Sequence, residues 1–524
     1  MLQVRQKSSI PAANDVIRRT AEAGIPLSWD RYEEQLPLCG FTQNGLNCSA
    51  CLQGPCRINP FGDAPSHGIC GIDAAQMVLH SLVEKVRRGA IDHVNVWLSG
   101  VGEHEPAATL SREKATAALA SRLPAPVLAH LAERSLLPRD VVLDVVTAGD
   151  PFFVDRGMLE QTRSSLLRLG VCAIVSSLGV CQATSATARG RSEAPSPPSS
   201  DGVMILLDGV APAGFVARLE ASLASQDDVG LASTSQVHAS GARFLVPGSP
   251  ELAVASGLAD FVIQSELGGY PSLGDLCDQM DIPHLTIASG DGWPDLADVL
   301  QRARAHHTRQ ARPLLDGGEA MESPADGWPA DIGETVRTAV RQGAVRGVVL
   351  LVGGTNIRQT HFERTAGVVK GLLAHDVVVL LAADAVRAAH LLDDLPAAAG
   401  RGLQALMRGR SRPWFSAGSV FESARALEVF GPLAGAEGFG AAPVAATFLE
   451  IPSFAFLAAA IGWLGLGVST QIGSPLPIWG SPSLTRWMTD ESRPWWGARL
   501  LASPELASPE EQVQQLVREL DARK

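Results

Sequence analysis

The sequence is short of positive charge. Its 524 residues include 43 Lys and Arg against 55 Asp and Glu, which gives a formal net charge of −12. Nucleic-acid binding depends on basic patches that neutralise phosphates, and this balance offers none. We therefore expect no nucleic-acid partner.

An apolar leader and a clear membrane span are also missing. The first residues, MLQVRQKSSIPAAND, contain no apolar run of the kind found in signal peptides, so we expect a cytoplasmic protein. The apolar stretch 454–468 (FAFLAAAIGWLGLGV) is shorter than the ~20 residues that a bilayer requires. Glu450 and Pro452 also lie just before it. We expect this stretch to be a buried core helix and not a membrane span.

Apolar periodicity divides the chain into three predicted domains. Residues 1–195 show helical spacing, as in IDAAQMVLHSLVEKVRRGA (72–90). Short apolar runs such as VMILLD and HLTIAS predict a parallel sheet in residues 201–310, and GVVLLVGG and VVVLLAA predict another in residues 330–524. The last domain is expected to end in an irregular Pro/Gly-rich segment, 469–484, and a polar helix. The predicted fold class is α/β with a helical N-terminal domain and two parallel-sheet domains.

Two nucleotide-binding motifs are absent from these α/β domains. Neither domain has G-x-G-x-x-G after its first strand, so a dinucleotide site is not indicated. The Gly-rich segment VGGTN at 352–356 lacks the lysine of a phosphate-binding loop.

Cysteine, in contrast, is concentrated in one place. Five of the eight cysteines lie between residues 39 and 70, and four of them, Cys48, Cys51, Cys56 and Cys70, follow the spacing C-x2-C-x4-C-x13-C. Without an export signal, clustered thiols are more typical of metal ligands than of disulfides. A [4Fe–4S] cluster takes four Cys ligands, and this spacing suits it better than zinc, which usually pairs two short knuckles. Zinc and a disulfide framework are the alternatives.

The residues between these thiols fit a cluster site. Gly54 and Pro55 suit a tight turn, and Gly71 allows close backbone approach. Arg57 can offset part of the negative charge of a thiolate-ligated cluster.

The pattern C-x7-N-C-x2-C-x4-C-R…G-I-C-G resembles the N-terminus of the nickel-dependent, anaerobic carbon monoxide dehydrogenases, relatives of the hybrid-cluster (prismane) proteins. The resemblance implies a helical domain followed by two Rossmann-like domains, the order predicted above, and a homodimer. It also implies one [4Fe–4S] cluster per subunit that relays electrons, held by the cysteines matching Cys48, Cys51, Cys56 and Cys70.

A further cluster in this family bridges the two subunits, with two cysteines from each. Its first cysteine matches Cys39, but its second falls on Asn47. An amide is a poor substitute for a thiolate at iron. The resemblance therefore implies that the bridging cluster is absent or altered and that Cys39 remains as a free or cross-subunit thiol.

The nickel–iron–sulfur centre of the family is also predicted to be absent. Other residues occupy the positions that the resemblance assigns to its histidine and cysteine ligands and to the catalytic lysine and histidine: Asp208, Val210, Ala232, Ser233, Gly268, Gly354, Asp384, Val420, Leu457 and Ala455. Outside the N-terminal cluster only Cys172, Cys181 and Cys277 remain, and these are expected to be ordinary buried side chains. Three scattered thiols cannot hold such a centre, and the small and apolar replacements suggest a filled cavity.

Two histidines need an interpretation. His93 falls where the family has a histidine-rich proton path, but only one histidine survives, so the path is predicted to be broken. His361 and Glu363 are expected to form a solvated polar helix start.

These features leave several functions open, and whether the chain is an enzyme is undecided. The first is an iron–sulfur protein of the dehydrogenase fold without CO chemistry, acting in electron transfer with a redox partner or in redox sensing. The second is a non-catalytic subunit paired with an active homologue. The alternative is a true carbon monoxide dehydrogenase that oxidises CO with water to CO₂ and passes electrons to a ferredoxin-type acceptor. A different small ligand is suggested only by the acids Asp208, Glu266 and Asp384.

Overall fold

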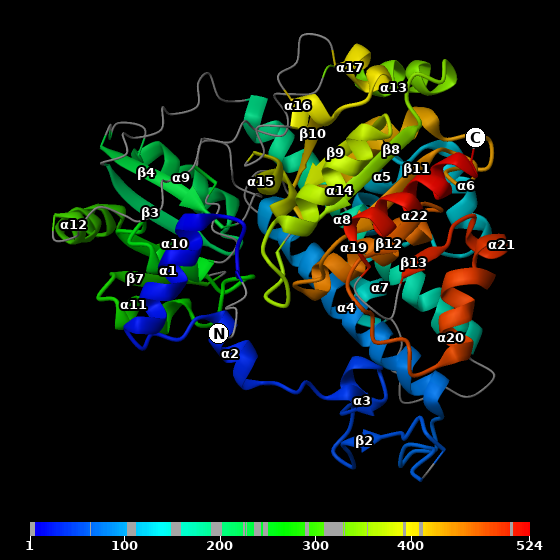
Figure 1. The fold of residues 1–524 in the computed structure, drawn as a ribbon, viewed down its shortest axis with the longest axis horizontal. Helices are drawn as coiled ribbons and strands as arrows, with labels where there is room; N and C mark the ends of the chain where they lie inside the picture. The colour runs from blue at the N-terminus through cyan, green and yellow to red at the C-terminus, as the bar shows by residue number, and fades with distance from the viewer. Residues whose placement is uncertain are drawn as a thin grey trace.

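A computed structural model of the chain describes most of its residues. These are 6–62, 64–101, 112–147, 159–189, 202–223, 226, 228–234, 243–244, 250–288, 293–308, 329, 331–353, 355–390, 395–407, 412–502 and 507–523. They form a helical region, a five-stranded sheet and a six-stranded sheet, and all strand pairs within these two sheets are parallel (Figure 1). The predicted fold class is confirmed.

Three helices form the centre of the helical region. They are α4 (Ala74–Val101), α8 (Leu159–Arg189) and α19 (Phe454–Gly465), and they pack on one another. The shorter helices of this region are α5 (Arg112–Ala120), α6 (Ala125–Glu133) and α7 (Val141–Thr147). Helix α19 contains the apolar stretch of the last domain and is almost entirely buried, as predicted for a core helix.

Glycines bring the backbones of these three helices into contact. A side chain on Gly170 of α8 would collide with the backbone of Gly462 in α19, and the reverse also holds. A side chain on Gly89 of α4 would collide with the carbonyl group of Phe454. Only glycine permits such an approach, so these positions fix α19 between α4 and α8.

One helical stretch is long and apolar enough to cross a membrane by length and composition. This stretch, Thr162–Thr184 of α8, is 83% buried inside the protein. Its packing against α4 and α19 accounts for its apolar character.

The middle sheet has the strand order β5-β4-β3-β6-β7. Its strands are β3 (Val203–Asp208), β4 (Val229–Ser233), β5 (Arg243–Phe244), β6 (Phe261–Ser265) and β7 (His284–Ile287). Successive residues of β3 point to opposite faces, so Ile205 and Leu207 pack with α9 (Ala213–Leu223) and α12 (Leu296–His307). Met204 and Leu206 pack with α10 (Pro250–Ala255) and α11 (Leu273–Gln279) on the other face.

The last sheet has the strand order β10-β9-β8-β11-β12-β13. Its strands are β8 (Gly347–Val352), β9 (Val377–Ala382), β10 (Trp414–Gly418), β11 (Val444–Phe448), β12 (Ser469–Ile472) and β13 (Leu500–Ala502). The other helices of this part are α13 (Ile332–Arg341), α14 (Glu363–Ala374), α15 (Asp384–His390), α16 (Leu395–Ala398), α17 (Arg401–Leu406), η4 (Val420–Ala426), α18 (Leu427–Phe430), η5 (Gly431–Leu433), α20 (Pro482–Arg486), η6 (Trp487–Glu491), α21 (Arg493–Trp496) and α22 (Pro509–Asp521).

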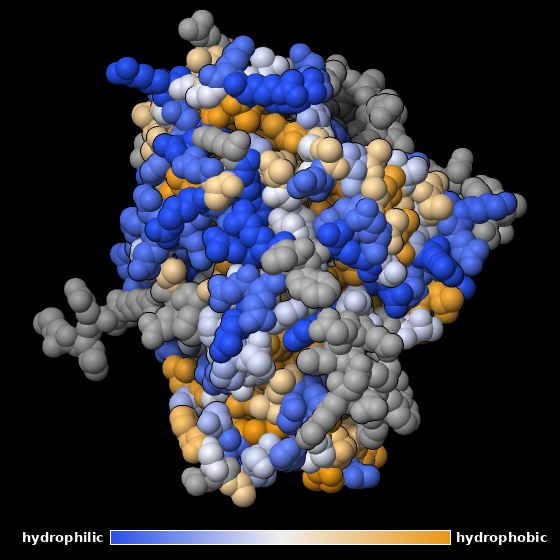
Figure 2. Space-filling view, turned by 90° about the vertical axis from the view of Figure 1, so that its right-hand side faces the viewer, coloured by the Kyte–Doolittle hydropathy of each residue, from blue (hydrophilic) through white to orange (hydrophobic). Residues whose placement is uncertain are grey.

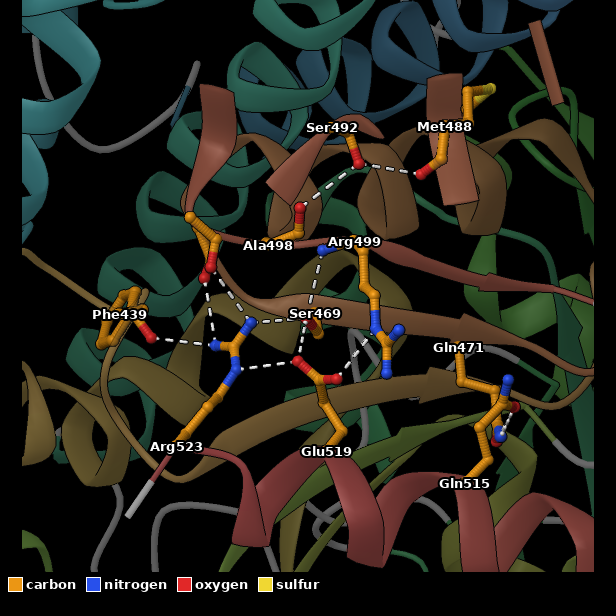
Figure 3. Close-up of polar contacts among 12 residues, drawn as sticks. Phe439, Ser469, Gln471, Met488, Ser492, Ala498, Arg499, Gln515, Glu519 and Arg523 are labelled. Atoms are coloured by element: carbon orange, nitrogen blue, oxygen red, sulfur yellow. Dashed lines mark hydrogen bonds and ion pairs between the residues drawn. The ribbon is translucent and has the colours of Figure 1, made fainter. Parts of the chain in front are cut away.

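Strand β12 lies in the segment that the sequence predicts to be irregular. Its residues, STQI, are polar except the last, yet all four are buried. Ser469 donates to Glu519 at 2.7 Å, and Gln471 donates to Gln515 at 2.7 Å, both on α22 (Figure 3). The polar groups of β12 are hydrogen-bonded by a helix more than forty residues later in the chain. Because the strand needs no apolar side chains to be buried, a search for apolar runs does not find it.

The docking of α22 depends on the buried carboxylate of Glu519. It accepts hydrogen bonds from Arg523 Nε at 2.9 Å and Arg499 Nε at 3.0 Å, in addition to that of Ser469 (Figure 3). Burial alone would raise the pKa of Glu519, but these hydrogen bonds and positive charges outweigh it and lower the pKa.

Two segments pack outside the predicted domain ranges. Helices α1 (Pro11–Glu22) and α2 (Ser28–Glu34) join the core of the middle sheet, and Figure 1 shows α1 beside α10, apart from α4. Helix α19 belongs to the predicted last domain by sequence but packs on α4 and α8 in the helical region. The ranges 1–195, 201–310 and 330–524 stay predictions, and the Pro/Ser-rich stretch between the first two lies outside the described residues.

We predict that Glu519→Ala lowers the free energy of unfolding by about 3–5 kcal/mol, because it leaves Arg523 buried without its carboxylate. Urea unfolding followed by circular dichroism measures this change. Asp521→Ala removes the more exposed ion pair with Arg346, and it should cost less than about 1 kcal/mol. Equal losses in the two variants would contradict the role of the Glu519 network.

Candidate metal centre

A short hairpin carries three of the cysteines. Strands β1 (Asn47–Cys48) and β2 (Cys56–Arg57) pair antiparallel, so that Cys48 lies directly opposite Cys56. Cys51 lies in the connecting turn, where the Gly54 amide donates to its carbonyl at 3.3 Å. The hairpin therefore brings three thiols of the predicted cluster to one end of a two-stranded ribbon.

A second turn brings the fourth cysteine to this hairpin. The amide of Gly71 donates to the Gly68 carbonyl at 2.9 Å, and Gly71 has a φ of +90°, which glycine adopts without strain. The amide of Ile69 donates to Cys56 Sγ at 3.4 Å, which ties this turn to β2. Cys70, next to Ile69, is thereby carried to the hairpin.

These donors fit an iron–sulfur cluster. Cys48, Cys51 and Cys56 are partly buried and Cys70 is exposed, so the four thiols lie at the protein surface. In the described part of the chain, no three His, Cys, Asp or Glu side chains gather closely enough to hold a single metal ion. A four-iron cluster binds each thiolate at a different iron and so suits this wider set better than a zinc ion does. The assignment of the four thiols to one cluster stays a prediction.

Cys39 and Asn47 lie on the same loop but do not complete a second thiol pair. Cys39 precedes the short helix α3 (Gly40–Gln43), and hydrogen bonds from Thr42 lower the pKa of its exposed thiol, with a smaller effect of the Arg57 charge. Asn47 lies opposite Arg57 in the hairpin. Each chain therefore offers a single thiol at the positions that the resemblance assigns to the bridging cluster.

The surface around the hairpin is apolar. Leu36, Leu52, Phe61 and Ile69 are each at least 50% exposed, and they are four of seven exposed large apolar side chains among the described residues. Figure 2 shows hydrophobic residues gathered at the lower end of the molecule, where Figure 1 places the cysteine loop. Such a concentration is typical of a protein–protein contact.

In the middle sheet, Asp208, at a position that the resemblance assigns to a metal ligand, accepts several hydrogen bonds. It lies at the carboxyl end of β3, where it accepts from Thr234 Oγ1 at 2.7 Å and from the Tyr270 amide at 2.6 Å. Gln264 of β6 also donates to it, at 3.4 Å. Burial is the main influence and raises the pKa of Asp208, while these hydrogen bonds oppose it.

The loop after β6 covers the end of β3. The Val210 amide donates to the Leu267 carbonyl at 2.7 Å, so Val210, which replaces an imidazole, lies buried under this loop. Ala232 and Ser233, at the end of β4, are also buried. Gly268 has open space around it, and Glu266 is exposed and outside the Asp208 network. These positions do not fit a metal centre, because they offer a single carboxylate that is already satisfied.

The last sheet has a similar arrangement that the sequence did not reveal. Glu450, just after β11, accepts from Asn356 at 2.6 Å and from Ser474 at 2.7 Å. Arg364 lies 3.9 Å from its carboxylate. Burial is the main influence and raises the pKa of Glu450. The one sequence feature that could have indicated a role for Glu450 is its place just after a strand, since ligands and polar clusters gather at the carboxyl ends of parallel strands.

The other positions that the resemblance assigns to ligands hold a hydrogen-bonded carboxylate or core side chains, or lie outside the described residues. Asp384 accepts from Thr355 at 2.6 Å at the end of β9. Val420 and Leu457 belong to the apolar core. Gly354 lies outside the described residues.

His93 is buried against the first turn of α19. Its Nε2 lies 3.1 Å from the carbonyl oxygen of Ala455, the residue at the predicted position of the catalytic histidine. Its ring makes an edge contact with Phe421. Burial lowers the pKa of His93 to about 4, so the imidazole is neutral at pH 7.

His361 differs from its prediction. Its side chain is only 2% exposed, so the expectation of a solvated helix start is wrong for His361, although Glu363 is exposed. Burial lowers the pKa of His361 to about 4. The burial of His361 could not be predicted, because the side chain that covers it, Trp29, is distant in the chain.

The three other cysteines are buried, as predicted. Burial raises the pKa of Cys172 strongly, and it raises the pKa of Cys181 and Cys277 to about 12. Cys181 donates to the Glu422 carbonyl at 3.3 Å. None of the three lies with the surface hairpin, which Figure 1 places below both sheets.

Comparison with known proteins extends these observations. A family model described as the Prismane/CO dehydrogenase family matches residues 275–506, a range that does not include the cysteine loop. Carbon monoxide dehydrogenase 1 of Carboxydothermus hydrogenoformans is 38% identical over 125 residues, covering 22% of this chain and 20% of that protein. The carbon monoxide dehydrogenase of Rhodospirillum rubrum is 42% identical over 86 residues, 16% of this chain and 14% of that protein.

The whole fold is also found among solved structures. Carbon monoxide dehydrogenase IV from Carboxydothermus hydrogenoformans matches with a TM-score of 0.81 and 19% identity, over 99% of both chains. At this identity the match describes the fold, while the sequence alignments span no more than a fifth of the two relatives.

We predict that His93→Gln reduces the loss of stability at low pH. The pKa of His93 is about 4 in the folded protein and 6.5 in the unfolded chain. The contribution of the neutral imidazole to the free energy of unfolding is therefore fully present above pH 6.5 and is lost as the pH falls to 4. Removing the imidazole should shrink this loss by up to about 3 kcal/mol, measured by urea unfolding across this range. Part of the loss should remain, since the pKa values of His130 and His361 are lowered to about 4 as well.

The exposed His67 supplies the control for this prediction. His67→Gln should leave the pH dependence unchanged. The same slope in His93→Gln and the unaltered protein would refute the buried, neutral state of His93.

Proposed function

We propose, because this chain belongs to the prismane/CO dehydrogenase family, that it is an iron–sulfur protein with one [4Fe–4S] cluster and without nickel-dependent CO oxidation. Cys48, Cys51, Cys56 and Cys70 would hold the cluster. The observation that carries the proposal is the contrast between two regions. The hairpin and the turn beside it hold all four thiols of the motif, whereas the positions that the resemblance assigns to the nickel centre hold hydrogen-bonded carboxylates and core side chains.

The hairpin has the properties of an electron-transfer or redox-sensing site. A [4Fe–4S] cluster, when bound, takes up or releases one electron. The partly exposed thiols would place it close to a docked partner, and the amide of Ile69 would stabilise the negative charge on Cys56 sulfur. Arg57, on the same ribbon, adds a positive charge nearby.

The absence of CO chemistry is supported by the donors present. A nickel–iron–sulfur centre requires several thiolates and an imidazole. Around the end of β3 the described chain offers Asp208, which already accepts three hydrogen bonds. The position assigned to the catalytic lysine carries Leu457, packed in the core.

The apolar surface around the hairpin supports a second chain as its occupant. Leu36, Leu52, Phe61 and Ile69 are exposed on the same stretch of chain as Cys39, the residue that the resemblance places at the subunit boundary. A homodimer would cover them with the same surface of a second copy. A heterodimer with an active homologue, or a redox partner at this surface, would be a different outcome of the same test. A thiol-ligated cluster also agrees with a reducing compartment such as the cytoplasm.

Carbon monoxide dehydrogenase activity is the second candidate, favoured by the activity that the relatives' names carry. Metal content separates the two. Anaerobically purified protein should contain about four irons and four sulfides per chain, with no nickel. Stoichiometric nickel together with CO-dependent reduction of a dye would establish the second candidate. Zinc without sulfide would overturn both.

We predict that Cys51→Ser loses most of its iron and its visible absorbance, because a four-iron cluster needs all four thiolates. Cys39→Ser is the matched control, since it removes an exposed thiol of the same loop that lies outside the predicted ligand set. It should keep about four irons per chain. Loss of iron in the control alone would show that the ligand set is wrong.

We predict that the double variant Leu52→Ser, Phe61→Ser is monomeric, because it removes two exposed apolar side chains from the proposed subunit contact. Light scattering coupled to size-exclusion chromatography measures the mass. Leu143→Ser changes a similarly exposed leucine on α7 and should leave the dimer intact. A dimer in all variants would exclude this surface as the contact, and a monomeric unaltered protein would favour a redox partner there.

A further inference from the structure

The N-terminal segment 6–34, which we call the strap, is attached to the last domain. Ser8 forms a parallel bridge with His361, and the Ser9 amide donates to the His361 carbonyl at 3.2 Å. The His361 amide in turn donates to the Lys7 carbonyl at 3.0 Å. Thr360 adds a side-chain hydrogen bond to the Gln6 carbonyl at 3.0 Å. The strap therefore binds the loop that follows β8.

The same strap is attached to the middle domain. Helix α1 packs on α10, and Val16 and Leu27 join the apolar core on that face of the middle sheet. Glu251, which is only 1% exposed, accepts from the Ser28 amide at 2.8 Å and forms an ion pair with Arg31. A buried carboxylate held by two groups of α2 is a specific anchor, because an unpaired charge there would be costly.

Trp29 connects the two attachments. Its side chain is 1% exposed and belongs to the apolar core of the middle domain. Its ring also lies 4.8 Å from the ring of His361 in the last domain, centroid to centroid. A single large side chain of α2 thus contacts both α/β domains. Figure 1 shows α1 and α2 along the middle domain.

Both attachments lie beside loops that carry former ligand positions. In the last domain, His361 ends the loop that begins with Thr355 and Asn356, which hold Asp384 and Glu450. In the middle domain, Ser272 donates to Glu251 at 2.5 Å, two residues after Tyr270, whose amide donates to Asp208. The strap therefore contacts residues 355–362 directly and is linked through Glu251 to residues 270–273.

We infer that the strap locks the two α/β domains together and fixes the loop after β8 and the loop after β6 in their positions. Domains of one chain move relative to each other unless a large or well-packed contact prevents it. Here the contact is supplied by a third segment that binds both domains, with Trp29 as its central side chain. Release of the strap is then the movement that would allow the two domains to move relative to each other. The inference concerns apolar and hydrogen-bonded contacts, and it holds whether or not the hairpin carries a cluster.

Amide hydrogen exchange on the full-length, anaerobically purified protein tests the strap. Trp29→Ala should speed exchange by about tenfold or more in two separate stretches, 355–362 and 270–273, because a large buried side chain is lost from between them. The iron content should not change. Arg18→Ala is the control, since Arg18 lies on the exposed face of α1 and pairs only with Asp15 and Glu22 among the described residues; it should leave both stretches unchanged.

A second variant keeps the test decisive if Trp29→Ala does not fold. Arg31→Gln removes the ion pair with Glu251 but leaves the apolar core intact, so it should speed exchange in 270–273 and not in 355–362. Faster exchange confined to residues 6–34 in both variants would overturn the inference. A fall in iron with unchanged exchange in the two loops would also overturn it, and this outcome is distinct from a failure of the cluster assignment, which the Cys51→Ser variant tests.

Discussion

Backbone contact between α4, α8 and α19 is the constraint on which the rest of the structure depends. At Gly89, Gly170 and Gly462 no side chain fits, so the three helices are fixed at the closest separation that helices allow. Helix α19 follows β11 directly, and its position therefore sets how the last sheet lies on the helical region. The same contact puts Ala455 against His93 and Leu457 into the core, which leaves no room there for longer polar side chains.

Hydrogen-bonded carboxylates cross-link the loops at the strand ends. A metal centre ties several strand-end loops together through one point. Asp208 joins β3, β4, β6 and the following loop through the side chains of Thr234 and Gln264 and the Tyr270 amide. Glu450 does the same for the loops after β8 and β12. A buried carboxylate is tolerated at such a place when its oxygens have partners. Both oxygens of Asp208 accept hydrogen bonds, whereas one oxygen of Glu450 accepts two and the other lies 3.9 Å from Arg364.

The sequence was a good guide where the burial of an element is local in origin. The apolar runs VMILLD and GVVLLV are buried on both faces and were recognisable as parallel strands. The four-cysteine motif could also be recognised, because its residues lie within one short loop, and their assignment to one cluster stays a prediction. Strand β12 and the burial of His361 were not predictable, because each depends on a distant segment, α22 in one case and Trp29 in the other. The contacts of the strap could not be predicted for the same reason. Helix α1 has the pattern of an ordinary amphipathic helix, and this pattern does not say which domain it packs on.

The cysteine hairpin and the strand-end loops of the two sheets are held by different contacts, which explains how one region can change without the other. The hairpin is held mainly by contacts within residues 39–72, such as the β1–β2 pairing and the hydrogen bond from Ile69 to Cys56. The loop before it meets the last domain, where the Gly480 amide donates to the Asn44 carbonyl at 3.0 Å. The strand-end loops are held instead by their own carboxylates and by the strap. The side chains at the strand ends therefore contribute little to the support of the four thiols, and Asn47 in the hairpin contributes little to that of the sheets. A fold assembled in this way lets the cysteine hairpin and the strand-end loops change separately.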